Sequence, residues 1–159
     1  TFNLIYGLAS RMQITLLDEP MNGMDEAIRD DFYRAILKEF IAYPRIIIIS
    51  SHHLNEIEHL IEEILLIDKG IVEIHMPLDE VQQMAVRISG QKEQIEPLLE
   101  NQVVLYEREQ SPFYEVTIET PPTIEQFERA GCSVQPESAR EVCKLLTQKT
   151  MGGIDDVFK

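Results

Sequence analysis

The chain has 159 residues, of which 28 are Asp or Glu and only 14 are Lys or Arg, so its net charge is -14. This acidic balance disfavours binding along the phosphate backbone of DNA or RNA, because that affinity depends on clustered basic side chains. The hydrophobic share of 44% can fill a core, and seven Gly with eight Pro are too few for a fibrous or disordered chain.

Membrane-spanning chains and disulfide frameworks are disfavoured as well. No apolar run approaches the roughly 20 residues that cross a bilayer, and the first residues do not form a signal peptide. Cys132 and Cys143 lie outside any CxxC motif, so we expect them to be packing residues in a reducing cytosol. Because Thr1 leads directly into helical periodicity, we expect the chain to be part of a longer protein.

The first 75 residues predict alternating helices and strands. Apolar residues at helical spacing predict helices over 1–13, 26–42 and 54–63. Short apolar runs predict strands at 14–17 and 46–49, and the four isoleucines of the second suit a strand buried on both faces of a parallel sheet. Two further runs, 64–68 and 71–74, predict a hairpin around Lys69-Gly70 that closes one side of this sheet.

Beyond Met76-Pro77 the pattern changes to short strands and short helices. The expected order is β-α-β-β-α-β, which is that of a ferredoxin-like module. The ranges are strand 85–90, helix 91–100, strands 102–109 and 113–120 around Ser111-Pro112, helix 122–131 and strand 132–137. A helix over 138–148 and a last turn close the chain.

The stretch ITLLDEPMNGMD (14–25) is the most informative part of the sequence. Its strand ends in Asp18 and Glu19, which we expect at the carboxyl edge of a sheet, where open α/β folds bind ligands. Asp18 could hold a hydrated Mg²⁺, and Glu19 could polarise a water for attack on a phosphoryl group. The alternative is that both carboxylates only cap the strand and place negative charge at the start of the next helix.

A second polar cluster, Ser50-Ser51-His52, follows the isoleucine run. We expect it at the same sheet edge as Asp18 and Glu19, where an imidazole can donate to a terminal phosphate oxygen. His52 could instead only cap the helix that begins at Leu54. The two clusters together favour a functional site over either capping role.

These residues resemble the nucleotide-binding subunit of an ATP-binding-cassette (ABC) transporter. The resemblance lies in three motifs in order: Walker B (ITLLDE), the D-loop (PMNGMD) and the switch-histidine region (IIIISSH). It covers residues 1 to about 75, and residues 53–73 resemble the helix and hairpin that follow the switch histidine. The ending IDDVFK (154–159) resembles that of the small C-terminal extension of many bacterial exporter ATPases.

The resemblance implies a role for each matching residue. Asp18 would be the Walker B residue that holds Mg²⁺ through water, Glu19 the catalytic base and His52 the γ-phosphate switch. Asp25 would be the D-loop carboxylate, and Ser51 would contribute to nucleotide binding. Met21 departs from the Thr or Ser often found after DEP, so no hydroxyl is present there.

One motif that the family needs is absent from the sequence. No glycine begins a GxxxxGK[ST] phosphate loop, so we expect this chain alone to be inactive and a full-length parent to bind and hydrolyse ATP. The resemblance further implies a membrane-spanning permease and a second ATPase subunit as partners. It places the protein in the cytoplasm, at the inner face of the membrane.

The sequence therefore predicts an α/β chain in two parts. Residues 1–75 would be the C-terminal part of an ABC ATPase of the P-loop NTPase fold, and residues 76–159 a small ferredoxin-like α+β accessory domain. Two alternatives stay open: a non-transport ABC ATPase acting on ribosomes or DNA, and a non-catalytic module that senses a ligand or partner. A metal site at His53, Glu56 and His59 is disfavoured, because residues six apart lie on nearly opposite faces of a helix.

Overall fold

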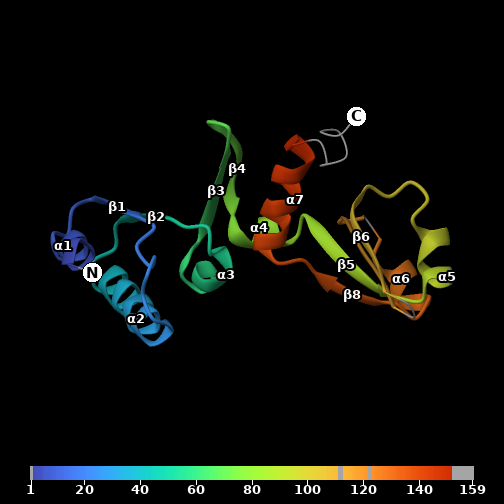
Figure 1. Cartoon of the computed structure of the whole chain (residues 1–159), viewed down its shortest axis with the longest axis horizontal. Helices are drawn as coiled ribbons and strands as arrows, with labels where there is room; N and C mark the ends of the chain where they lie inside the picture. The colour runs from blue at the N-terminus through green and yellow to red at the C-terminus, as the bar shows by residue number, and fades with distance from the viewer. Residues whose placement is uncertain (1, 111–112, 122, 152–159) are drawn as a thin grey trace. The chain divides into compact units, whose positions relative to one another are not determined.

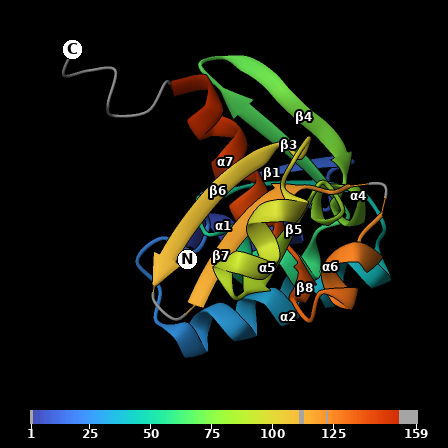
Figure 2. The ribbon, with the colours of Figure 1, turned by 90° about the vertical axis from the view of Figure 1, so that its right-hand side faces the viewer.

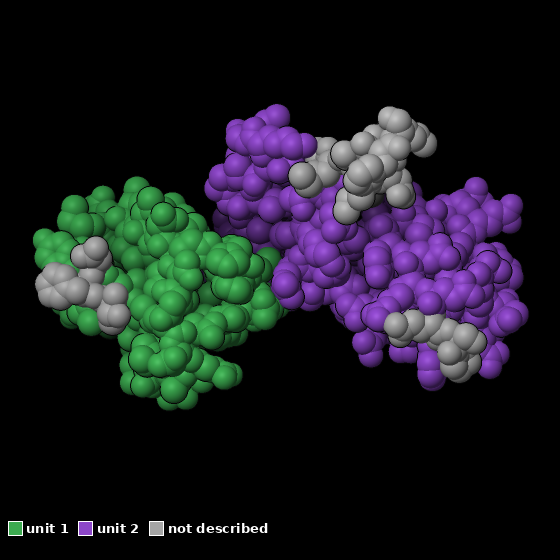
Figure 3. Space-filling view, viewed as in Figure 1, with its two compact units in different colours: residues 1–60 green, residues 61–159 purple. Residues whose placement is uncertain are grey.

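The computed structural model describes residues 2–110, 113–121 and 123–151. It is a mixed α/β structure with small sheets. The chain divides into two compact units, residues 1–60 and 61–159, coloured green and purple in Figure 3. The ending 154–159 and the turn at Ser111-Pro112, both singled out in the sequence, lie outside the described residues.

Unit 1 contains the helix, strand, helix and strand that the first half of the sequence predicts (Figure 1). Its elements are α1 (Phe2–Ala9), β1 (Ile14–Asp18), α2 (Glu26–Ala42), β2 (Ile46–Ser50), α3 (Leu54–Ile57) and the 3-10 helix η1 (Glu58–Leu60). The helices predicted over 1–13 and 54–63 are shorter than expected. The second becomes a 3-10 turn at Glu58 and is followed by a strand from Glu63.

Strands β1 and β2 pair in parallel and in register, from Ile14 opposite Ile46 to Asp18 opposite Ser50. Helix α2 connects them, as a parallel connection requires. The helix begins after Asp25 and ends before Pro44, and it buries Phe32, Tyr33 and Ile36. The predicted βαβ unit is therefore present.

The expectation that the isoleucine strand is buried on both faces is wrong for the described structure. Thr15 and Leu17 of β1 are buried, but the alternate residues Ile14 and Leu16 are 61% and 69% exposed. In β2, Ile46 and Ile48 are exposed as well. Since side chains alternate across a strand, one face of this two-stranded sheet is covered and the other is open.

Unit 2 begins with a hairpin that forms a sheet of its own. Strands β3 (Glu63–Asp68) and β4 (Ile71–Pro77) pair with each other in a separate two-stranded sheet. The hairpin therefore does not close the β1–β2 sheet, contrary to the prediction. Its turn is as expected, because Lys69 and Gly70 both have positive φ, at 48° and 80°. This is the geometry that a two-residue hairpin turn requires.

A short helix and a four-stranded sheet follow. Helix α4 (Leu78–Gln82) was not predicted, because five residues are too few to show a helical period. The remaining elements are β5 (Ala85–Gly90), α5 (Lys92–Ile95), the 3-10 helix η2 (Glu96–Leu98), β6 (Val104–Gln110), β7 (Phe113–Glu119), α6 (Glu125–Arg129), β8 (Ser133–Pro136) and α7 (Ala139–Met151). Pro97 lies where the predicted helix 91–100 changes to a 3-10 turn.

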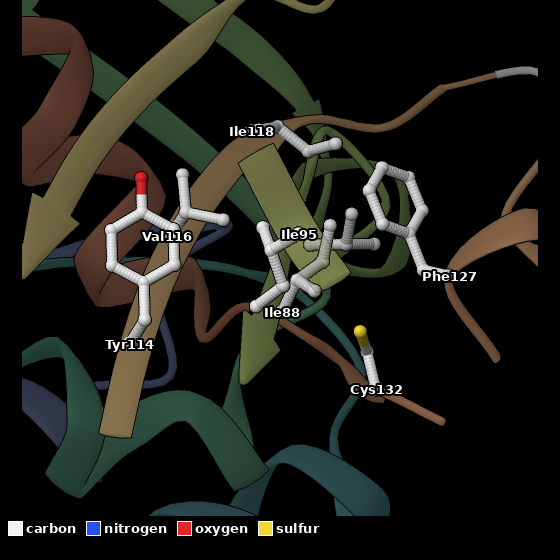
Figure 4. Close-up of a cluster of buried hydrophobic side chains, with 8 residues drawn as sticks. Ile88, Ile95, Tyr114, Val116, Ile118, Phe127 and Cys132 are labelled. Carbon is white, nitrogen blue, oxygen red and sulfur yellow. The ribbon is translucent and has the colours of Figure 1, made fainter. Parts of the chain in front are cut away.

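The sheet has the spatial order β6-β7-β5-β8, with every neighbouring pair antiparallel. Figure 2 shows β6 and β7 side by side. Ile95 of α5 and Phe127 of α6 are both fully buried against one face of the sheet, together with Ile88, Val116 and Ile118 (Figure 4). This cluster is the main core of unit 2.

Neither Cys132 nor Cys143 forms a disulfide, and both side chains are buried, as expected of packing residues. Burial raises the pKa of the Cys132 thiol, which disfavours the reactive thiolate. Tyr114, another member of this core cluster, has its pKa raised to about 12, first by burial and then by the carboxylate of Glu107.

The opposite face of the sheet carries a buried ion pair. Arg87 of β5 donates from Nε to Glu137 Oε2 at 3.0 Å and from Nη2 to Glu137 Oε1. The Glu137 side chain is only 1% exposed, and it also accepts hydrogen bonds from Thr117 Oγ1 and the Ser138 backbone N–H. These bonds tie β5, β7 and the start of α7 together. Helix α7 also packs on α4.

Within the described residues, no helix combines the length and the apolarity that crossing a membrane requires.

Candidate functional site

The candidate site lies at the carboxyl ends of β1 and β2, as predicted from the sequence. The in-register parallel pairing places Asp18 directly opposite Ser50. Both side chains lie on the open face of the sheet, because Asp18 alternates with the buried Leu17. Glu19 and His52 come one and two residues beyond these strand ends.

Ser50 joins the two carboxylate residues through one hydroxyl group. Its Oγ lies 2.5 Å from Asp18 Oδ1 and 2.9 Å from the backbone nitrogen of Glu19. An ionised carboxylate can only accept hydrogen bonds. The Ser50 hydroxyl therefore donates a hydrogen bond to Asp18 and accepts one from the Glu19 N–H. The same N–H also points to the Ser50 carbonyl oxygen at 3.2 Å.

Glu19 has a backbone conformation that the sequence did not indicate. Its φ is 41°, in the left-handed region that non-glycine residues rarely adopt and that costs on the order of 1–3 kcal/mol. The strand therefore ends abruptly at Asp18, and the chain turns through Asn22, whose N–H donates to the Glu19 carbonyl at 3.1 Å. Residues in such strained conformations cluster at functional sites.

This turn brings Glu19 into contact with His52. The Glu19 Oε1 and His52 Nδ1 atoms are 2.7 Å apart, although the residues are 33 positions apart in sequence. With the carboxylate ionised, His52 must carry its proton on Nδ1 to donate to it. The His52 side chain is 61% exposed and that of Glu19 37%, so the pair faces solvent and water can reach the carboxylate.

The other two predicted residues have different surroundings. Ser51 Oγ accepts from the His53 backbone N–H at 3.0 Å, within the turn that leads into α3. Asp25 is the N-cap residue of α2 and its carboxylate makes no capping hydrogen bond. The described structure thus brings Asp18, Glu19, Ser50 and His52 together through hydrogen bonds, whereas the contacts given for Ser51 and Asp25 do not include this group.

A second network fixes the segment that follows His52. Arg29 of α2 donates to Glu56 Oε2 of α3 at 2.5 Å, and the Tyr33 hydroxyl lies 3.3 Å from the same oxygen. His59 packs edge-on against the Tyr33 ring, with 5.3 Å between the ring centroids. Glu56 therefore joins α3 to α2 through these hydrogen bonds.

The donors at the site fit a magnesium ion only in part. Within residues 2–110, 113–121 and 123–151, no group of three or more His, Cys, Asp or Glu side chains could hold a metal. Asp18 offers hard carboxylate oxygens at the strand end. This is compatible with a Mg²⁺ that keeps most of its water ligands and takes only one or two protein carboxylates.

A cavity of about 320 Å³ lies elsewhere, in unit 2. Its lining includes Ala85, Thr120 and Val142, and none of the candidate site residues. It is therefore separate from the strand-end chemistry.

Comparison with known proteins gives two distant matches. The chain is 30% identical over 86 residues to the ABC transporter ATP-binding protein YtrB of Bacillus subtilis (strain 168), covering 54% of this chain and 30% of that protein. It is 36% identical over 58 residues to the cholesterol transporter ABCA5 of Homo sapiens, covering 36% of this chain and 4% of that protein. No family model matches the chain. The chain is thus distantly similar to parts of ABC proteins, and it spans less than a third of either relative.

Proposed function

We propose that this chain is the C-terminal part of the ATP-binding and ATP-hydrolysing subunit of an ABC transporter. The observation that carries the proposal is the contact between Glu19 and His52 at the ends of two parallel, in-register strands. Both relatives are named as transporter proteins, and the sequence motifs occur in the order that this family has.

Each residue of the site then has a chemical role. Glu19 accepts a proton from the water that attacks the γ-phosphate of ATP. His52 holds the Glu19 carboxylate through Nδ1, which leaves Nε2 as the ring nitrogen that faces the phosphate. Ser51 would contribute to nucleotide binding and Asp25 to contact with a second ATPase subunit.

Asp18 is the residue that would hold Mg²⁺, through water. A Mg²⁺ ion held there would supply positive charge that neutralises the phosphate oxygens during transfer of the terminal phosphoryl group to water. The role of Asp18 is to keep a carboxylate oriented at the strand end, and the bond from Ser50 holds one of its two oxygens in place. The other oxygen is not held by Ser50.

The sequence holds no GxxxxGK[ST] loop, so tight ATP binding would require further sequence in a longer parent protein. Residues 1–75 would belong to the ATPase domain of the P-loop NTPase fold. Residues 76–159 would form an accessory domain, and the strand order β6-β7-β5-β8 supports a ferredoxin-like arrangement for it. Transport would pass through a separate membrane permease, with the ATPase at the cytoplasmic face.

The test is ATP hydrolysis by a full-length parent that contains this sequence and a phosphate loop. Replacing Glu19 by Gln removes the base while keeping its size, so turnover should fall about 100-fold or more while ATP binding persists. Glu128→Gln is the matched control. It makes the same replacement of a carboxylate by a carboxamide at an exposed position of α6, and it should keep full turnover. Unchanged hydrolysis in Glu19→Gln would contradict the assignment, and absence of any hydrolysis in the wild-type parent would contradict the function.

A further inference from the structure

We infer that the Ser50 hydroxyl is the positioning group that orients both carboxylate residues of the site, Asp18 and Glu19. This inference rests on the proposed function for its catalytic consequence. Its structural content concerns only the arrangement of three residues at the ends of β1 and β2.

The first observation is that one hydroxyl satisfies two different groups. Ser50 Oγ donates to Asp18 Oδ1 at 2.5 Å and accepts from the Glu19 N–H at 2.9 Å. A serine hydroxyl has a single proton and two lone pairs, so its donor is fully used by Asp18. The orientation of the Asp18 carboxylate and the position of the Glu19 backbone are therefore set by the same oxygen atom.

The second observation is the strained backbone of Glu19. A φ of 41° is unfavourable for a glutamate and persists only where surrounding bonds determine it. The bonds that hold the Glu19 N–H are the Ser50 hydroxyl at 2.9 Å and the longer one to the Ser50 carbonyl at 3.2 Å. Loss of the hydroxyl leaves only the weaker bond, so Glu19 can relax towards an extended conformation.

The consequence reaches His52 through Glu19. The 2.7 Å contact between Glu19 Oε1 and His52 Nδ1 depends on the direction in which the Glu19 side chain leaves the strand end. Relaxation of the Glu19 backbone turns the carboxylate away, and His52 loses the acceptor that fixes its proton on Nδ1. Ser50 thus acts on the base, on the metal-holding carboxylate and on the imidazole without contacting the reacting atoms.

The experiment compares two substitutions of the same shape, Ser50→Thr and Ser50→Val. Both are β-branched and suit a strand, but only threonine keeps a hydroxyl. In the 159-residue chain, the ¹⁵N shifts of the His52 ring report which nitrogen carries the proton. We expect the Nδ1–H form in the wild type and in Ser50→Thr, and a shift towards the Nε2–H form in Ser50→Val, as in Glu19→Ala, which removes the acceptor oxygen.

In the full-length parent, Ser50→Val should lower kcat and raise the Mg²⁺ concentration required for half-maximal activity, each about 10- to 100-fold. The KM for ATP should change little, and Ser50→Thr should restore both quantities. Ser133→Ala, an exposed strand serine in β8, is the control and should leave all of these unchanged.

The two measurements separate the possible failures. If the His52 ring shifts of Ser50→Val match the wild type, or if Glu19→Ala leaves them unchanged, the positioning role is wrong whatever the enzyme assay shows. If the ring shifts behave as expected but the parent hydrolyses no ATP, the proposed function is wrong and the positioning geometry stands. An equal loss of kcat in Ser50→Thr and Ser50→Val would also overturn the role of the hydroxyl.

Discussion

Arg29 and Glu56 form an ion pair across 27 positions of sequence, with Arg29 Nη1 2.5 Å from Glu56 Oε2. The hydrogen bond from Arg29 holds the pKa of Glu56 below its ordinary value of 4.5, and the same bond raises the pKa of Arg29. The pair joins α3 to α2, and α3 is the helix that directly follows His52. The ion pair therefore anchors the helix that begins two residues after His52.

The lowered pKa of Glu56 predicts an acid-dependent loss of stability. A carboxyl with a lower pKa in the folded state contributes stability above its unfolded value, and this is lost as the pH falls through the folded value. Glu56→Gln should therefore be less stable than the wild type at neutral pH, and the difference should shrink below about pH 4.5. Urea denaturation followed by circular dichroism over this range measures it. A stability difference between Glu56→Gln and the wild type that stays the same across this pH range would contradict the account.

The buried pair in unit 2 predicts a large effect at neutral pH. Glu137→Gln leaves Arg87 without a buried counter-charge, and breaking such a pair costs about 3 kcal/mol. The cost lies towards the low end of the usual range because the Arg87 side chain is 39% exposed. Chemical denaturation gives the free energy of unfolding. Glu125→Gln, which breaks an exposed pair with Arg129, should cost about 0.5 kcal/mol or less, and equal costs would contradict this account.

Truncation of two adjacent residues of β1 should change the free energy of unfolding by very different amounts. Leu17 is 5% exposed and Leu16 is 69% exposed. Leu17→Ala removes buried methyl groups and should destabilise by about 2–4 kcal/mol, whereas Leu16→Ala should change the free energy of unfolding by about 0.5 kcal/mol or less. Equal losses in the two variants would show that the open face of the sheet is covered in solution.

Replacing glycine by alanine should lower the free energy of unfolding at one position and raise it at another. Gly70 has a φ of 80° with open space around it, so Gly70→Ala should cost about 1–2 kcal/mol through backbone strain alone. Gly7 lies within α1, and an added methyl group would meet Leu17 at an ordinary 3.7 Å. Gly7→Ala should therefore stabilise by about 0.5–1 kcal/mol. Thermal unfolding of both variants tests the pair.

Much of the local structure was predictable because it depends on nearby residues. Helix α2 follows from apolar residues at helical spacing and from Pro44, and the β3–β4 turn follows from Gly70. Asp18, Glu19 and His52 were identified because each lies at the end of an apolar run. In each of these cases, the interactions that determine the local structure join residues only a few positions apart in the chain.

The remaining features depend on tertiary contacts that periodicity does not report. The isoleucines of β2 are apolar on both faces, but the sequence does not say what covers each face. The left-handed conformation of Glu19 depends on Ser50, which is 31 positions away, and the role of Glu56 depends on Arg29. Ser50 could be preferred to Ser51 only once the strand register was known.

The in-register pairing of β1 with β2 also has a consequence for folding. Asp18 and Ser50 are separated by 32 positions, and parallel strands cannot be joined by a tight turn. The chain must close this long loop and order α2 before the two strand ends can meet, and contacts of such high sequence separation form slowly. The hairpin β3–β4 can form from neighbouring residues alone. The polar groups of the site should therefore assemble after the local turns, late in the folding of the unit that contains them.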